Sequence, residues 1–475
     1  MASFMPLWLL PLIFLYIFGA AAGDGQPSSA AFTLSVVRRK PLDSSSSSPT
    51  APFRSSLSRA AADHSRGKGP SSPKNLRTPP PPQRNYTVKY TMALTITLPI
   101  GVPPQYQRMV LDTGSQLMWM PCLMDTAKPT ASKAATPPLP MFHNHTGPFS
   151  ISMSNTLSFF PCKESCKPKM FHQGVDNYCN ADYTTCTYST PYADGTLSEG
   201  TLVRENITDL ANSSSQSDPG KFLMGCANSA TDSEGILGMN LGDYSFISQS
   251  KYQTFSYCVP VREMVHGRRR YPDGAFYLGV NPNSATFNYT KLLSFSDAAV
   301  FPPSLNLQAY VVNMTGIRIG GKKLDIPVTD FVNSTLGEGQ TIIDSGTEYT
   351  LLVNHSYWII KEEVRRLTGA NFKMGYLYQG VMDMCIDGSA TAIGEMLGNM
   401  TFEFDNAVEI FIPGERLAFD VDGRNVSCLG IGNSGNIDEP SNLVGNFHQQ
   451  NLWVEFDLAR FRVGFGKADC SRALL

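Results

Sequence analysis

Two short blocks of the sequence place an acidic residue between an apolar stretch and a tight turn. Residues 109–115 read MVLDTGS and residues 341–347 read TIIDSGT, which puts Asp112 and Asp344 232 positions apart. A buried strand that runs into Asp and then Gly presents the carboxyl group at the end of the strand. Two such carboxyls in a desolvated crevice cannot both ionise cheaply, so they would share one proton. Such a pair can act as a base toward water and as an acid toward a carbonyl oxygen.

Hydroxyl residues and glycines flank each acidic residue. The hydroxyls can donate hydrogen bonds to the loop and to the carboxylate oxygens, while the glycines keep each turn tight. The flanking residues are Thr113, Gly114, Ser115, Ser345, Gly346 and Thr347. An apolar-apolar-Gly element follows each block, at 235–238 and 443–445. One block alone is more typical of an ordinary Asx-turn, but two copies with matching Gly elements indicate a duplicated architecture.

A β-hairpin is predicted between the two blocks. Its strands would cover residues 188–192 and 197–203, joined by an Asp-Gly turn at 193–196. An aromatic residue at such a tip, here Tyr192, can exclude water and offer one hydroxyl donor. The alternative is a surface hairpin with a packed tyrosine.

The elements that would position these groups are mostly strands. Residues 86–92 alternate between apolar and polar types, and residues 94–98 continue the pattern before a turn. Further strand-like stretches are 275–280, 310–319, 401–412, 452–456 and 461–465. Charged residues make up 16% of the 475-residue chain, which argues against disorder or a coiled coil as the main architecture. The sequence therefore predicts a mainly β protein.

Helical signals are few. Residues 357–367 predict one helix, with Asn354 or Ser356 as its cap and Gly369 just beyond its end. A second helix is predicted to start near Ser245.

The first 85 residues differ from the rest of the chain. Residues 5–18 are an apolar run followed by small residues, so 1–22 predict a signal peptide, with an uncleaved membrane anchor as the alternative. Residues 23–85 hold ten Lys or Arg against three Asp or Glu, together with Ser and Pro runs. This composition favours a basic, low-complexity prosegment over a mere linker.

The ten cysteines are an even number, which in an exported protein predicts five disulfides. Four of them, at 162, 166, 179 and 186, could mimic a zinc site, but export favours disulfides. Ten Asn-x-Ser/Thr sequons favour a glycosylated surface. They are Asn85, Asn144, Asn206, Asn212, Asn288, Asn313, Asn333, Asn354, Asn399 and Asn425.

The chain resembles the pepsin-like aspartic endopeptidases, and more closely their plant atypical branch of nepenthesin-like and nucellin-like proteins. The match spans residues 86–472 and is densest in 112–119, 192–196 and 445–453. The resemblance implies a mainly β, bilobal fold of two β-barrel lobes related by a pseudo-two-fold axis, with a central cleft. Residues 86–290 would form the N-terminal lobe with the first catalytic Asp and the flap, and 291–475 the C-terminal lobe with the second catalytic Asp.

The same resemblance implies roles for individual residues. Asp112 and Asp344 would be the catalytic pair of a secreted peptidase, active at acidic pH after removal of the prosegment. Ser115 and Thr347 would orient the outer carboxylate oxygens, while Thr113 and Ser345 would bridge the two loops. The flap and its support would comprise Tyr192, Gly195, Thr196 and Trp119.

The disulfide pairing is also implied by the resemblance, because the sequence alone leaves it open. The implied pairs are Cys122–Cys226, Cys162–Cys186, Cys166–Cys179, Cys258–Cys470 and Cys385–Cys428. The chain departs from nepenthesins proper in lacking a Cys-x-x-Cys just after the first loop, where residues 123–156 form an irregular insertion. It also lacks the saposin-like insert of typical plant enzymes.

Other classes of ligand are disfavoured. A net charge of −2 gives no basic field for nucleic acid. Residues 430–435 match a dinucleotide-binding glycine pattern, but no helical pattern follows them. We expect polypeptide substrates, no metal, cofactor or nucleotide, and a monomer. The expected location is the secretory pathway, outside the cell or in the cell wall, with the vacuole or the endoplasmic reticulum as alternatives. The competing function is that of a catalytically inactive binding or inhibitor protein with the same fold.

Overall fold

The computed structural model describes residues 83–90, 92–123, 147–162, 166, 175–193, 195–210, 221–230, 234–265, 268–270, 272–294, 305–332, 339–378, 380–421 and 424–473. The predicted signal peptide and nearly all of the predicted prosegment lie outside these residues. The described residues belong to one compact unit, Phe32–Leu475.

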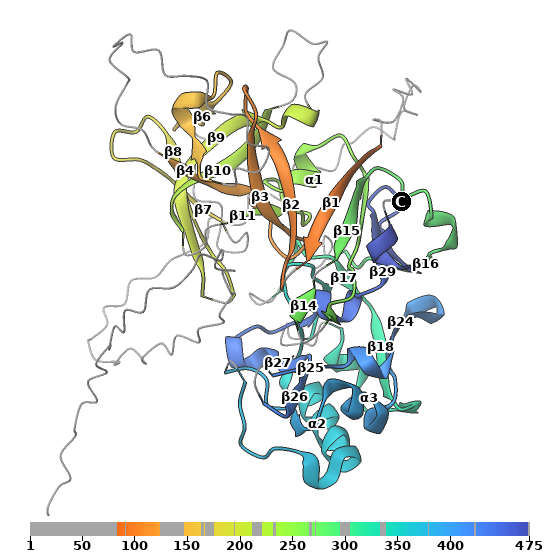
Figure 1. The fold of residues 1–475 in the computed structure, drawn as a ribbon. Helices are drawn as coiled ribbons and strands as arrows, with labels where there is room; N and C mark the ends of the chain where they lie inside the picture. The colour runs from red at the N-terminus through yellow and green to blue at the C-terminus, as the bar shows by residue number, and fades with distance from the viewer. Residues whose placement is uncertain are drawn as a thin grey trace, which may run out of the picture. The chain divides into compact units, whose positions relative to one another are not determined.

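The described residues are mainly β-strand, as predicted, and Figure 1 shows the arrangement of the strands. The largest sheet contains β1 (Arg84–Tyr90), β2 (Leu94–Ile100), β3 (Gln105–Asp112), β4 (Trp119–Leu123), β5 (Phe149–Ser150), β6 (Ser158–Phe159), β7 (Asp176–Cys179), β8 (Cys186–Pro191), β9 (Leu197–Asn206), β10 (Lys221–Ala230), β11 (Gly235–Gly238), β12 (Thr254–Cys258), β15 (Asp273–Leu278), β16 (Asn288–Lys291), β29 (Leu452–Asp457) and β30 (Arg462–Lys467).

Smaller sheets follow. The first consists of β13 (Glu263–Val265) and β14 (Arg268–Arg270). The second consists of β17 (Val311–Val312), β20 (Thr341–Ile343), β28 (Asn442–Val444), β21 (Thr350–Leu352) and β27 (Ile431–Asn433). The third consists of β19 (Lys322–Lys323), β18 (Met314–Ile319), β23 (Met400–Phe404) and β24 (Val408–Ile412), and the fourth of β22 (Cys385–Asp387), β26 (Val426–Leu429) and β25 (Ala418–Asp420). The described strands thus form one large sheet and four smaller ones, in agreement with the expected mainly β, pepsin-like fold.

The two sequence blocks begin the same strand topology twice. β3 lies parallel to β11, and β11 lies antiparallel to β4, which in turn lies parallel to β10. In the second half, β20 lies parallel to β28, β28 antiparallel to β21, and β21 parallel to β27. The segments 235–238 and 442–444 therefore supply the strands beside the two Asp-bearing strands, in the same arrangement in both halves.

The large sheet also joins the two halves of the chain. β29, near the C-terminus, lies antiparallel to β12, with Phe255 opposite Phe456 and their rings stacked 4.8 Å apart. The expected boundary at residues 290/291 falls inside β16, which pairs with β30. Leu111 and Ile343, directly before the two Asp residues, both belong to the largest core cluster. The core therefore supports both blocks together.

Three α-helices are described: α1 (Phe246–Gln249), α2 (Asn354–Thr368) and α3 (Ala390–Leu397). α1 starts directly after Ser245, as predicted, and the Ser245 side chain caps it. The cap predicted for α2 is wrong, since the helix begins at Asn354 itself and no side chain caps it. The Asn354 amide oxygen instead accepts a hydrogen bond from the Trp358 indole N–H. The described residues contain no helix long and apolar enough to cross a membrane.

The sequence missed α3 and a turn. Residues 401–412 looked like one strand, but β23 and β24 are the two arms of a hairpin. The turn between them holds Asn406 at φ 62° and Ala407 at φ 55°. Asn adopts this left-handed backbone more readily than most residues, so the Asp405-Asn406 pair was the available turn signal.

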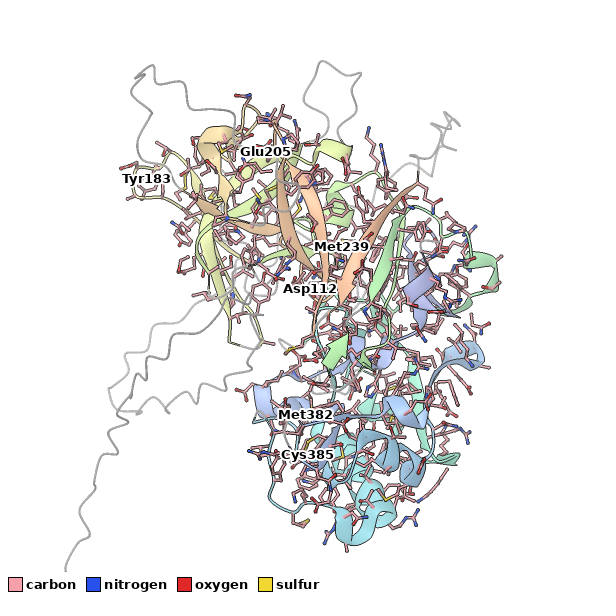
Figure 2. The ribbon with its side chains drawn as sticks, in the orientation of Figure 1. Asp112, Tyr183, Glu205, Met239, Met382 and Cys385 are labelled. Carbon is pink, nitrogen blue, oxygen red and sulfur yellow. A yellow bond between two sulfur atoms is a disulfide. The ribbon has the colours of Figure 1, made fainter. Side chains whose placement is uncertain are left out.

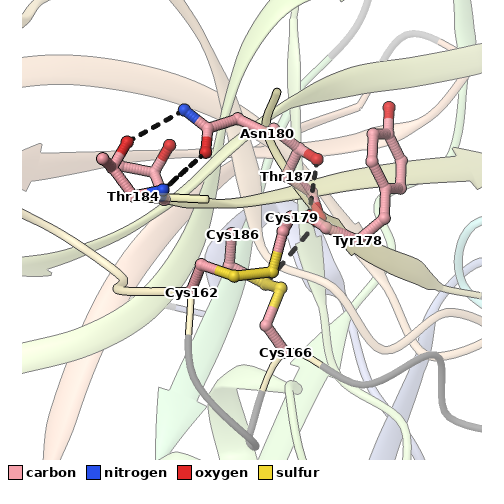
Figure 3. The surroundings of a disulfide bond; sticks show 9 residues. Cys162, Cys166, Tyr178, Cys179, Asn180, Thr184, Cys186 and Thr187 are labelled. Atoms are coloured by element: carbon pink, nitrogen blue, oxygen red, sulfur yellow. Dashed lines mark hydrogen bonds between the residues drawn. A yellow bond between two sulfur atoms is a disulfide. The ribbon is translucent and has the colours of Figure 1, made fainter. Parts of the chain in front are cut away.

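Three of the five implied disulfides are present: Cys122–Cys226, Cys258–Cys470 and Cys385–Cys428. The other two are wrong, because the chain forms Cys162–Cys179 and Cys166–Cys186, which Figure 3 draws together. Cys179 and Cys186 lie opposite each other on the β7–β8 hairpin, so spacing alone does not decide their partners. In the structure Cys166 and Cys186 are both buried, whereas Cys162 and Cys179 are both half-buried.

Candidate active site

Asp112 is the last residue of β3 and Asp344 directly follows β20. Their exposed fractions are 7% and 6%, so both carboxyls are nearly removed from water. Figure 2 labels Asp112 at this strand end. The parallel neighbour of each strand ends beside its Asp: Gly238 stands opposite Asp112, and the Asp344 N–H donates to the carbonyl of Val444 at 3.2 Å.

The hydrogen bonds to the two carboxylates are the same in both loops. The Gly114 N–H donates to Oδ1 of Asp112, and the Gly346 N–H to Oδ1 of Asp344, each at 2.8 Å. The Ser115 hydroxyl donates to Oδ2 of Asp112 at 2.5 Å. The Thr347 hydroxyl donates to Oδ2 of Asp344 at 2.6 Å. Ser115 and Thr347 thus contact the oxygens that the sequence analysis expected them to orient.

Thr113 and Ser345 tie the two loops together. The Thr113 N–H donates to Oγ of Ser345 at 3.0 Å, and the Ser345 N–H donates to Oγ1 of Thr113 at 2.9 Å. Each hydroxyl then donates across the loops to a strand carbonyl, Thr113 to Ile343 and Ser345 to Leu111. All four groups are buried, so this reciprocal set fixes one loop against the other.

The carboxyls face each other across the glycines. A Cβ on Gly346 would lie 2.2 Å from Oδ1 of Asp112, and one on Gly114 would lie 2.8 Å from Oδ1 of Asp344. No side chain fits at either position, so glycine is what lets the two acidic groups approach. Burial first, and then the charge of Asp344, raise the pKa of Asp112 to about 7.

Gln449 and Asn446 support the Asp344 loop through hydrogen bonds to its backbone, a role that the sequence analysis did not assign to them. The Gln449 side chain donates to the carbonyls of Val444 at 2.7 Å and Asp344 at 3.3 Å. The Asn446 side chain donates to the Ser345 carbonyl at 3.0 Å and accepts from the Tyr90 hydroxyl at 2.9 Å. Both residues lie in the densely matching segment 445–453, which was the available signal.

The predicted hairpin is confirmed by the pairing of β8 with β9, from Thr187↔Thr201 to Pro191↔Leu197. Gly195 takes a φ of 84°, which a residue with a side chain rarely adopts. The Tyr192 N–H donates to the Thr196 carbonyl at 2.9 Å and closes the tip. The indole N–H of Trp119 donates to the Tyr192 hydroxyl at 2.6 Å, so Trp119 holds the ring as expected.

Replacing Tyr192 with Phe removes this hydroxyl and leaves the ring. We expect kcat/KM for peptide hydrolysis to fall about tenfold, because the Trp119 N–H loses its acceptor and the ring its fixed position. A fluorogenic peptide assay measures the effect. Tyr183, an exposed turn residue on the same sheet, supplies the matched control Y183F. Equal rates for Y192F and wild type would show that the hydroxyl has no part in turnover.

A cleft of about 220 Å³ opens at the two carboxyls. Asp112, Asp344, Tyr192 and Thr196 line it. So do Gly114, Ser115, Gly346 and Thr347, whereas Thr113, Trp119, Gly195 and Ser345 are not among the lining residues. Apolar walls come from Val110, Ile236, Ile342, Leu351 and Leu443. Such walls suit apolar groups of a ligand, bound next to the two carboxyls.

Two more acidic residues of the cleft were missed by sequence reasoning. Glu348, next to Thr347, accepts a hydrogen bond from the Arg262 guanidinium at 2.6 Å. Arg262 comes from the first half of the chain and lies 4.5 Å from the centre of the Tyr90 ring. Glu439 lines the same cleft from the second half. Neither residue carries a local sequence signature.

Among the described residues, no cluster of His, Cys, Asp or Glu is arranged to hold a metal ion. The glycine-rich segment at 430–435 runs through β27 into a short 3₁₀ helix, Ser434–Ile437. It therefore does not supply the α-helix N-terminus at which a dinucleotide phosphate binds.

Known protein families and curated relatives match most of the chain. Two family models match, "Xylanase inhibitor N-terminal" over residues 94–268 and "Xylanase inhibitor C-terminal" over 309–467. The aspartic proteinase PCS1 of Arabidopsis thaliana is 32% identical over 403 residues, which cover 80% of this chain and 83% of the relative. Aspartic proteinase nepenthesin-1 of Nepenthes gracilis is 26% identical over 385 residues, or 79% of this chain and 77% of the relative.

Solved structures with the same fold include two seed proteins. Basic 7S globulin from soybean has a TM-score of 0.56 at 18% identity and covers 83% of this chain and 100% of its own. Conglutin gamma from lupine seeds has a TM-score of 0.56 at 17% identity and covers 82% of this chain and 98% of its own. At these identities the likeness concerns the fold alone.

Proposed function

The chain belongs to the family of plant pepsin-like aspartic proteinases, and on that premise we propose that it is an endopeptidase with Asp112 and Asp344 as its catalytic pair. One observation carries the proposal: two nearly buried carboxyls, held by matching sets of donors, line one cleft. The pair shares a proton, because Asp112, with its pKa raised to about 7, stays protonated in acid.

The proposed reaction uses that single proton. A water molecule between the two carboxyls loses a proton to the charged one and attacks the peptide carbonyl carbon, while protonated Asp112 donates to the carbonyl oxygen. A tetrahedral diol forms, and a proton passed to the peptide nitrogen then expels the amine. The hydrogen bonds from Ser115 and Thr347 keep both carboxyls oriented throughout. The Tyr192 hairpin covers the bound chain and excludes water.

The chemistry of the chain supports a secreted, glycosylated zymogen that matures to a monomeric enzyme. All cysteines are in disulfides, which persist in oxidising compartments. Sequon residues Asn85, Asn288 and Asn425 are exposed, as an attached sugar requires. Export through residues 1–22 and removal of residues 23–85 belong to the same proposal.

Hydrolysis of denatured protein at acidic pH tests the function directly. The secreted protein, after removal of the prosegment, should release peptides below pH 7, and the aspartic-protease inhibitor pepstatin should suppress the release. Activity should decline as the pH rises through about 7, because Asp112 then loses the shared proton. A heat-denatured sample is the control. Turnover that pepstatin leaves intact would overturn the proposed mechanism.

The second candidate is a binding protein with the same fold. It is favoured by the two matching family models, whose names refer to xylanase inhibitors. Intact donors on both carboxyls and the Trp119–Tyr192 contact favour turnover instead. Complete absence of hydrolysis after prosegment removal, by a protein that still melts cooperatively, would decide for the binder.

A further inference from the structure

We propose that Glu439 makes one subsite of the cleft selective for a Lys or Arg side chain of the polypeptide substrate. This inference rests on the proposed function and adds a substrate preference to it. The apolar walls alone would favour apolar side chains, so a cation-selective subsite is a departure from the rest of the groove.

The backbone around Glu439 holds its side chain in place. The 3₁₀ helix Ser434–Ile437 ends at Asp438, whose φ of 57° is left-handed. The Glu439 N–H then donates back to the Ser434 carbonyl at 3.1 Å, and the Pro440 carbonyl accepts from the Gly339 N–H at 2.9 Å. The Ser441 N–H donates to Oε1 of Glu439 at 2.9 Å. The carboxylate is therefore oriented before any substrate arrives.

Of the acidic side chains that line the cleft, Glu439 is the one whose charge has no counterpart among the described residues. The described lining residues include four acidic side chains and no Lys, Arg or His. Asp112 and Asp344 share a proton, and Glu348 pairs with Arg262 at 2.6 Å. Within the described part of the chain, no Lys, Arg or His nitrogen lies within ion-pairing distance of Glu439. A substrate cation would supply the missing partner.

The surroundings of Glu439 suit a long basic side chain. Ile437 and Leu443 line the cleft beside it, and the methylene stem of Lys or Arg can pack on such apolar groups while its charged end reaches a carboxylate. Glu439 is half-buried, so an ion pair there is less screened by water than one on the open surface. Burial raises the pKa of Glu439, the hydrogen bonds from Ser441 lower it, and the charge of Asp344 adds a smaller rise. Glu439 therefore loses its charge at a higher pH than an ordinary glutamate, so the preference for Lys should weaken as the pH falls.

Paired peptides test the inference. In one cleavable peptide, each position near the cut bond is changed in turn to Lys or to norleucine, and kcat/KM is measured for both. We expect one position at which wild type prefers Lys, and at that position Glu439→Gln should lower the Lys-to-norleucine ratio about five- to tenfold. Glutamine keeps the size of the side chain and its bond from Ser441.

The matched control is Glu409→Gln, which removes the same charge from an exposed position on β24. It should leave the ratio unchanged, whereas an equal fall in both variants would attribute the preference to overall charge and overturn the inference. An unchanged ratio in Glu439→Gln would also overturn it, while wild-type hydrolysis kept the proposed function. If wild type cleaves no peptide, the proposed function fails, and fluorescence anisotropy of the two labelled peptides still measures the ratio as a ratio of affinities.

Discussion

Asp112→Asn and Asp344→Asn will each lower kcat/KM for peptide hydrolysis by at least about a thousandfold while the protein stays folded. Either substitution removes one of the two acid–base roles, and each role typically contributes about 10²–10⁴-fold. Neither remaining role works alone, since the base and the acid act on one proton shared by the pair. A fluorogenic peptide at acidic pH measures the loss.

The control for these variants is Asp182→Asn, which changes an exposed turn carboxyl. Circular dichroism and thermal melting establish that all three variants fold, and mass spectrometry establishes that the introduced Asn has not deamidated. Full activity in either dyad variant would mean that the convergence of the two loops serves something other than hydrolysis.

Asp112 will also make the folded protein less stable as the pH rises from acidic to neutral. Its pKa is about 7 in the folded protein, against an ordinary value of 3.8. Below pH 3.8 the carboxyl is protonated in both states, so the stability that this group contributes is fully present. Between pH 3.8 and about 7 only the folded protein holds the proton, so that contribution decreases as the pH rises. The shift corresponds to a loss on the order of 2–4 kcal/mol.

Asp112→Asn isolates this effect, because asparagine carries no charge at any of these pH values. Relative to wild type, the variant should gain stability on the order of 2–4 kcal/mol between pH 4 and pH 8. Urea unfolding followed by tryptophan fluorescence at several pH values gives the difference in unfolding free energy. The exposed Asp182→Asn variant should show no such trend. A difference between Asp112→Asn and wild type that stays constant with pH would show that Asp112 titrates normally.

The parts of the fold that repeat were predictable from the sequence. Each Asp block carries local signals, an apolar run and a tight turn, and the structure pairs each Asp strand with its Gly element in the same way in both halves. The hairpin that ends in Tyr192 was predictable because its turn residues impose a backbone conformation. These features are set by residues close together in sequence.

The rest depended on contacts between distant segments. The partners of Cys162 and Cys166 depend on how the chain segment that carries them folds against the β7–β8 hairpin, and the spacing of four nearby cysteines carries no such information. Glu439 reaches the cleft only because the chain after it forms β28, which lies beside the Asp344 strand β20, whereas Glu348 directly follows the Asp344 block. A glutamate in a loop has the same local sequence appearance whether it faces a cleft or bulk water.

The pairing of β12 with β29 has a consequence for synthesis of the chain. Until residues 452–467 have left the ribosome, β12 ends its sheet with an unpaired edge that other strands could join. The first half therefore cannot finish folding before the C-terminal strands are synthesised, although the Asp112 loop is synthesised more than three hundred residues before them. Truncations near the C-terminus should consequently yield aggregates rather than a working N-terminal fragment.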